Sequence, residues 1–170
     1  MVRVEHVLDT WRGIREDTAL AVEEFPADDF DFRPTPDVST FRHIARHVLD
    51  SSDALAGSLL AGVEDFHLPE ARAKFKEYFR PLAADCSPTE LASALRESLD
   101  QHAARLKAQP AEFFEHPVTR VDGVNTTRLE FVQWIKEHEL THRQQLFMYL
   151  RLKGITPATT KRRLARQAAK

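Results

Sequence analysis

Two matching helix-start motifs constrain the fold of this 170-residue chain more than any other feature. Ser87-Pro88-Thr89-Glu90 and Thr127-Arg128-Leu129-Glu130 both have the pattern of a capping box, in which a hydroxyl residue and a later glutamate satisfy free backbone N–H groups. Each motif precedes apolar residues at spacings of three and four, which is typical of an amphipathic helix. The first motif therefore predicts a helix that reaches about Ala108. The second predicts one that reaches Lys153, before Gly154.

Two further long helices are predicted in the first third of the chain. Residues 4–24 carry apolar side chains at helical spacing, and residues 39–62 repeat the pattern after Ser39, a good N-cap. A short additional helix is expected over residues 69–79, and residues 112–125 suggest a small hairpin. The low number of glycines, five, argues against a turn-rich β fold, so the expected fold class is all-α. Four long helices joined by long connections predict a four-helix bundle.

Length, composition and charge indicate how many domains and which classes of partner to expect. A single domain over residues 1–157 is expected, followed by a basic tail over 158–170 that we interpret as a solvated, partly frayed terminus. The net charge of −2 gives no reason to expect nucleic acid or a membrane as partner. A single cysteine, Cys86, excludes an internal disulfide and any CxxC motif. The charged amphipathic start has no signal-peptide pattern, so a cytoplasmic protein is expected.

His138 and His142 form the strongest functional signal. Four residues apart on a helix, they project from one face and can bind one divalent ion. We predict that they lie on the inward seam of the bundle, since apolar residues continue the same stripe. That predicted stripe consists of Phe131, Ile135, His138, His142, Gln145 and Tyr149. The alternative is a pair of core histidines that are hydrogen-bonded to neighbours or exposed at a bundle end.

The same segment matches HExxH, the helix of zinc peptidases in which Glu139 would be the general base. Peptidases of that type usually take a third ligand from downstream. The chain after His142 contains no Asp, Glu, His or Cys, so the third ligand must come from upstream. His47, at the inner edge of the second helix's apolar stripe, is the better choice, and His43 is kept as the second candidate.

Two anchors resemble the DinB superfamily along essentially the whole chain. The first is Phe32-Arg33-Pro34 followed by the serine-opened helix that leads to His47, and the second is the helix segment 138–151 with its HExxHRxQL pattern. Glycine is frequent in the family at the position that Gln144 holds here. The resemblance implies an up-down-down-up four-helix bundle and a divalent metal, zinc or nickel, bound by His47, His138 and His142. It also implies a homodimer.

The family includes bacillithiol and mycothiol transferases, so the resemblance suggests transfer of a low-molecular-weight thiol to a small electrophilic substrate, in detoxification or stress response. Three imidazoles leave an open position on the metal, which is typical of a catalytic site. Glu139 is either a proton acceptor or a surface glutamate. Arg143 and Gln145 are expected at the entrance or beside the ligands, and Arg46 could pair with carboxylates of a thiol cofactor. A metal-dependent hydrolase and a non-catalytic metal-binding protein stay open as alternatives.

Overall fold

Four long helices form the body of the protein. The computed structural model describes residues 3–169, in which these helices are α1 (Val4–Glu24), α2 (Phe41–Leu60), α4 (Pro88–Lys107) and α6 (Arg128–Leu152). They agree with the predicted segments, and both capping boxes are present, at Ser87 and Thr127. The second helix begins one residue later than expected, because Thr40 rather than Ser39 caps it by accepting a hydrogen bond from the His43 N–H.

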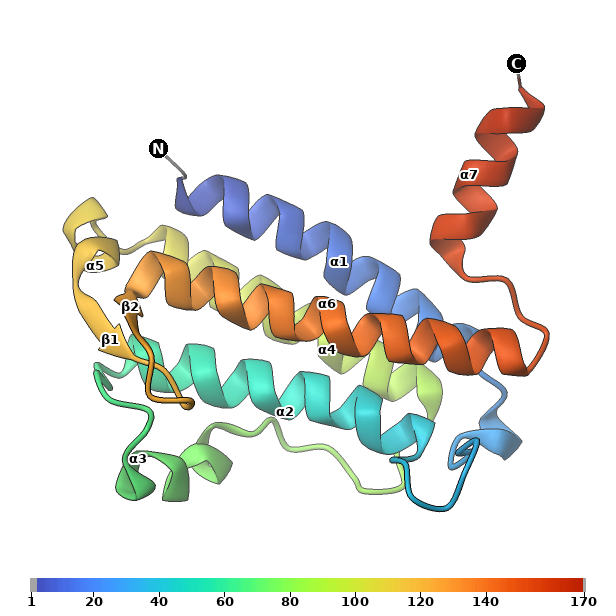
Figure 1. Ribbon diagram of the computed structural model, residues 1–170, viewed down its shortest axis with the longest axis horizontal. Helices are drawn as coiled ribbons and strands as arrows, with labels where there is room; N and C mark the ends of the chain where they lie inside the picture. The colour runs from blue at the N-terminus through green and yellow to red at the C-terminus, as the bar shows by residue number, and fades with distance from the viewer. Residues whose placement is uncertain (1–2, 170) are drawn as a thin grey trace.

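The bundle has the up-down-down-up arrangement implied by the family resemblance. Each long helix packs against two others, in the cyclic order α1, α4, α2, α6. Figure 1 shows α1 and α6 running in one direction, with α2 and α4 running in the other. This order places α2 beside α6, which is the contact that brings distant histidines together.

Short elements connect the long helices at the ends of the bundle. The predicted helix over residues 69–79 is divided into α3 (Pro69–Ala73) and a 3-10 turn, η2 (Phe75–Tyr78), and another 3-10 turn, η1 (Ala27–Asp29), follows α1. The predicted hairpin is present as β1 (Pro117–Thr119) and β2 (Asn125–Thr127), preceded by α5 (Ala111–Glu115). These strands are antiparallel, with Val118 opposite Thr126. Figure 1 shows the hairpin beside the start of α6.

The basic tail differs from the prediction, because it is helical. Residues Ala158–Ala168 form α7, which leaves the end of α6 and points away from the bundle in Figure 1. Pro157 stops α6 from continuing but also stands just before the first turn of the new helix, where a missing N–H costs nothing. Arg162 and Lys161 connect α7 to Asp17 and Glu24 of α1. A frayed terminus was therefore the wrong expectation for this segment.

A polar layer divides the apolar core into two parts. One part lies around Phe25, Phe41 and Leu146, and the other lies around Trp11 and Phe131. Between them the layer consists of Arg15, Thr18, Ser52 and Glu139, and we call it the central polar layer. All four of its side chains are buried.

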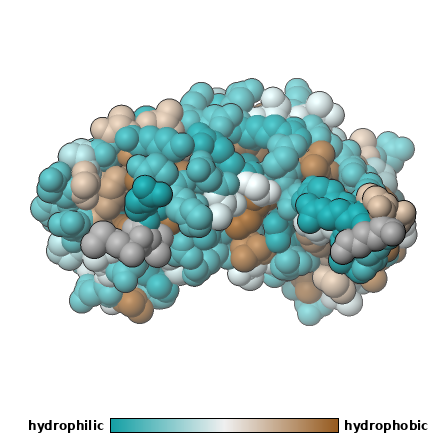
Figure 2. Space-filling view, turned by 90° about the horizontal axis from the view of Figure 1, so that it is seen from above, coloured by the Kyte–Doolittle hydropathy of each residue, from teal (hydrophilic) through white to brown (hydrophobic). Residues whose placement is uncertain are grey.

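The face of the molecule seen from above Figure 1 is mainly hydrophilic (Figure 2). Seen from above Figure 1, apolar side chains form small separate patches among polar ones (Figure 2). Among residues 3–169, no helix combines the length and apolar character that crossing a bilayer requires.

Candidate metal centre

Three histidines from two helices meet in the groove between α2 and α6. His138 and His142 lie one turn apart on α6, and His47 faces them from α2. The Nε2 atom of His138 is 3.3 Å from Nε2 of His47 and 3.1 Å from Nε2 of His142. One nitrogen from each ring can be chosen so that all three atoms lie within 4.8 Å of one another. The group that the sequence suggested is therefore brought together by the fold.

The separations of the nitrogens suit ligands of a single ion. Two nitrogens that bind zinc at about 2.0–2.1 Å with tetrahedral angles lie roughly 3.3–3.4 Å apart. The distance between His47 and His138 has this value, and that between His138 and His142 is slightly shorter. Neutral imidazole nitrogens are good ligands for zinc and nickel. The three residues thus fit a divalent metal with at least one coordination position left for a substrate.

Polar neighbours orient two of the rings. The Nδ1–H of His142 donates to Oε1 of Gln145 at 2.7 Å, since an amide oxygen can only accept. This bond places the free lone pair of His142 on Nε2, the atom that faces His138. The hydroxyl of Ser51 lies 3.2 Å from Nδ1 and 3.3 Å from Nε2 of His47. Gln145 therefore lies beside His142, and Ser51 lies beside His47.

Desolvation keeps two of the imidazoles, those of His138 and His47, in the neutral form that binds metals. It lowers the pKa of His138 to about 4, and the adjacent rings of His142 and His47 add to the effect. The pKa of His47 is also lowered, mainly by burial and then by His142 and His43. Metal ions bind the neutral ring, so these shifts reduce competition from protons at neutral pH.

The inward seam predicted for α6 is wrong in the middle of the helix. His138 and His142 are half-buried and Gln145 is exposed, whereas Glu139 is only 2% exposed. Glu139 occupies the buried position because Arg15 of α1 neutralises its charge inside the bundle. The histidines are consequently rotated towards the groove, where a small molecule can reach them.

Glu139 and Arg143 face α1 rather than the groove. The carboxylate of Glu139 accepts hydrogen bonds from Trp11, Arg15 and Thr18, so the alternative of a surface glutamate is wrong. Arg143 pairs with Asp17 at 3.3 Å and is mostly buried. The catalytic or entrance roles predicted for Glu139 and Arg143 gain no support from these contacts, which join α6 to α1.

Two cavities flank the three histidines. The first, which we call the aromatic cavity, has a volume of about 520 Å³ and includes His47 and His138 in its lining. The second, which we call the Met148 cavity, has a volume of about 560 Å³ and includes His47 and His142. His43 contributes to both cavities, although it is outside the group of three. The candidate metal centre therefore lies between two spaces of small-molecule size.

Sequence reasoning missed most of the aromatic cavity. Its apolar wall consists of Ala54, Leu55, Phe75, Phe79, Val121 and Trp134. Arg46 also lines it, but the guanidinium pairs with Asp50 at 2.9 Å and donates to the Leu82 carbonyl. Phe75 and Phe79 belong to a connection whose position cannot be inferred from helical spacing. The binding role predicted for Arg46 stays a prediction.

Comparisons with known proteins agree with the fold. A DinB-like protein, YjoA from Bacillus subtilis, has a TM-score of 0.68 at 19% identity, and the match covers 88% of this chain and 93% of that one. YfiT from Bacillus subtilis, described as a probable metal-dependent hydrolase with an unusual four-helix bundle topology, has a TM-score of 0.64 at 14% identity, with 92% of both chains covered.

A third structure is a mutant of a mycothiol-dependent maleylpyruvate isomerase, with a TM-score of 0.64 at 15% identity, covering 85% of this chain and 61% of that one. At these identities the likeness establishes the fold. No curated protein matches the chain by sequence. The model of the DinB family, however, matches residues 1–169, almost the whole sequence. The chain therefore belongs to the DinB family.

Proposed function

We propose that this protein is a metal-dependent transferase that joins a low-molecular-weight thiol to a small electrophile. The observation that carries the proposal is the position of the three histidines between two separate cavities. A transfer reaction needs two substrates whose reacting atoms meet at one point. Each cavity includes His47 together with one histidine of α6, so molecules bound on the two sides would approach each other at the centre.

The residues of the chain would bind and orient rather than attack. His47, His138 and His142 would hold a divalent ion, zinc or nickel, whose positive charge favours the thiolate over the thiol. The thiolate sulfur forms a bond to the electrophilic carbon, the bond from that carbon to its leaving group breaks, and the proton lost from the thiol neutralises the leaving group. No cysteine of the protein is needed, which is consistent with the buried position of Cys86.

Hydrolysis on the same histidines is the second candidate. The structure described as a probable metal-dependent hydrolase shares this fold over nearly its full length. A hydrolase also needs a group to accept a proton from water. Glu139, the general base of an HExxH site, is engaged with Arg15 inside the bundle. Among the residues that line the aromatic cavity, Asp50 is the carboxylate, and Arg46 already pairs with it. These contacts favour transfer.

Metal analysis tests the binding site. We expect near-stoichiometric zinc or nickel in the parent protein after loading and dialysis, and a loss of at least tenfold in affinity for His47→Ala or His138→Ala. His43→Ala is the matched control, since His43 lies one turn from His47 and outside the group of three. Equal metal content in His47→Ala and His43→Ala would contradict the assigned ligands.

A thiol-dependence assay tests the reaction. The metal-loaded protein is incubated with an epoxide and either mycothiol, glutathione, cysteine or no thiol, and the products are identified by mass spectrometry. A thioether formed faster than in the metal-free control supports the transferase. Diol formation without thiol would instead indicate hydrolysis. The absence of any product above background would favour a metal-binding protein without turnover.

The proposal also covers the location, the physiological role and the oligomeric state of the protein. A thiol transferase of this kind would act in the cytoplasm, where low-molecular-weight thiols are reduced, and would serve in detoxification or stress response. We also propose a homodimer, as the family resemblance implies, and this can be tested by measuring the mass in solution.

A further inference from the structure

We propose that the aromatic cavity is the subsite for an uncharged, planar apolar group, such as an aryl ring, on the electrophilic substrate. This inference rests on the proposed transferase function, because it assigns one of the two cavities to one of the two substrates. The chemical class of the electrophilic substrate follows from the residues that form the apolar wall of this cavity.

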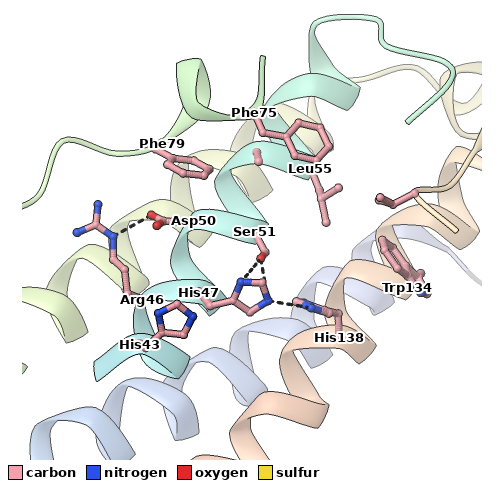
Figure 3. Close-up of a pocket in the computed structure, with 12 residues that line it drawn as sticks. His43, Arg46, His47, Asp50, Ser51, Leu55, Phe75, Phe79, Trp134 and His138 are labelled. Atoms are coloured by element: carbon pink, nitrogen blue, oxygen red, sulfur yellow. Dashed lines mark hydrogen bonds and ion pairs between the residues drawn. The ribbon is translucent and has the colours of Figure 1, made fainter. Parts of the chain in front are cut away.

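Most of the surface that lines the cavity is apolar. Phe75 and Phe79 approach from the segment after α3, while Leu55 of α2 and Trp134 of α6 complete the sides (Figure 3). The three aromatic side chains are only half-buried, so each exposes part of its ring. An apolar ligand that covers this surface removes it from water, and this favours binding. Aromatic rings also favour stacked or edge-to-face contact with another ring.

The cavity leads directly to the metal ligands. His47, Ser51 and His138 form part of its lining, and the ring centroid of Trp134 is 6.2 Å from that of His138. Figure 3 shows Phe75 and Phe79 on one side of His47, with Trp134 beyond His138. An aryl group held against these rings would have its attached reactive carbon close to the histidines. The subsite and the reactive centre are therefore continuous.

The charged groups of the cavity favour a neutral ligand. Arg46 and Asp50 are its cation and anion, and they pair with each other at 2.9 Å. Arg46 also donates to the carbonyl of Leu82. A carboxylate or phosphate on the substrate would have to compete with Asp50 for the guanidinium. An uncharged ring leaves this pair intact.

The wall is held in a defined position by contacts outside the cavity. Tyr78 packs so closely on α2 that a Cβ atom at Gly57 would lie 2.6 Å from its ring. Arg120 of the hairpin lies over the ring of Trp134, with 4.7 Å from the guanidinium carbon to the ring centroid. These contacts hold the ring of Trp134 and the segment that carries Phe75 and Phe79 before a ligand arrives, which reduces the entropy lost on binding.

Binding of a non-reactive probe tests the subsite without requiring turnover. The probe is 2-naphthalenemethanol, titrated into the zinc-loaded protein and followed by NMR. We expect intermolecular nuclear Overhauser effects from the naphthalene protons to Phe79, and a Kd at least tenfold weaker in Phe79→Ala. Leu68→Ala is the matched control, because Leu68 is an exposed apolar residue that precedes the same segment outside the cavity. The expected Kd of this control is that of the parent.

Contacts of the probe to other surfaces in the parent protein, or equal Kd values in Phe79→Ala and Leu68→Ala, would overturn the inference. If Phe79→Ala does not fold, the nuclear Overhauser effects between the probe and the parent protein still test the inference. Rates with styrene oxide and propylene oxide, measured with each of mycothiol, glutathione and cysteine, separate this inference from the proposed function. Binding of the probe at Phe79 without turnover of either epoxide would refute the transferase and leave the subsite. Equal rates of thiol transfer to the two epoxides, together with no binding of the probe, would refute the subsite and leave the transferase.

Discussion

Replacing Glu139 by alanine should destabilise the protein strongly while leaving its metal site intact. Both partners of the ion pair between Arg15 and Glu139 are 2% exposed, with 2.8 Å between Nε and Oε1. Trp11 and Thr18 also donate to the carboxylate, at 2.5 and 3.0 Å. The substitution would leave the guanidinium buried without its counter-charge and the Trp11 N–H without an acceptor, whereas the Thr18 hydroxyl would keep the carbonyl of Ile14. If Glu139 instead acted as the general base of a peptidase-like site, Glu139→Ala would lower the activity and leave the stability unchanged.

The expected loss is large compared with the total stability of a domain. Removing one partner of a buried ion pair typically costs about 3–5 kcal/mol. In a chain of this length each kcal/mol lowers the Tm by about 2–4 °C, so a fall of roughly 12 °C is expected. The Arg15→Met, Glu139→Leu double variant should recover most of this loss, because it replaces both charges by apolar side chains of similar volume.

Urea unfolding of the metal-free protein, followed by circular dichroism, measures the change in the free energy of unfolding. Glu137→Ala is the control, since Glu137 is exposed on the same helix and contacts Gln133. We expect this control to stay within about 0.5 kcal/mol of the parent. A loss below about 1 kcal/mol in Glu139→Ala, or reduced zinc stoichiometry in the folded variant, would refute the assignment of Glu139 to the central polar layer.

Three further predictions concern the groove and its surroundings. Gly57→Ala should lower stability by about 1–3 kcal/mol, since the added methyl group would meet the Tyr78 ring; an unchanged urea midpoint would contradict this. Gln145→Leu should weaken zinc binding about 10–100-fold in a chelator competition, because it removes the acceptor for Nδ1 of His142. Because the pKa of His138 is lowered to about 4, the unfolded chain binds more protons than the native one from about pH 6.5 down to pH 4. The metal-free protein should therefore lose stability as the pH falls through this range, and His138→Gln should reduce the slope of Tm against pH.

The predictions from the sequence agree best with the structure where they depend on residues that are close together in the chain. The capping boxes at Ser87 and Thr127 define their helices because the bonded groups lie three residues apart. The spacing of His138 and His142 predicts their common face for the same reason. Glu139 shows the limit of this reasoning, since its buried position depends on Arg15, more than a hundred residues away. A prediction from hydrophobic periodicity places a glutamate on the polar face of its helix, because it does not consider a counter-charge on another helix.

The sequence by itself determined the helices, their approximate ends and the common face of the two histidines in the candidate metal site, because each depends on residues within a few positions of one another. The resemblance of its motifs extended this to the family and to His47. Tertiary structure alone decided that α2 packs beside α6, that the histidines turn to the groove while Glu139 turns inward, and that Phe75 and Phe79 wall a cavity next to them. These features depend on which helix faces meet, and that is set by burial and charge pairing across the whole bundle.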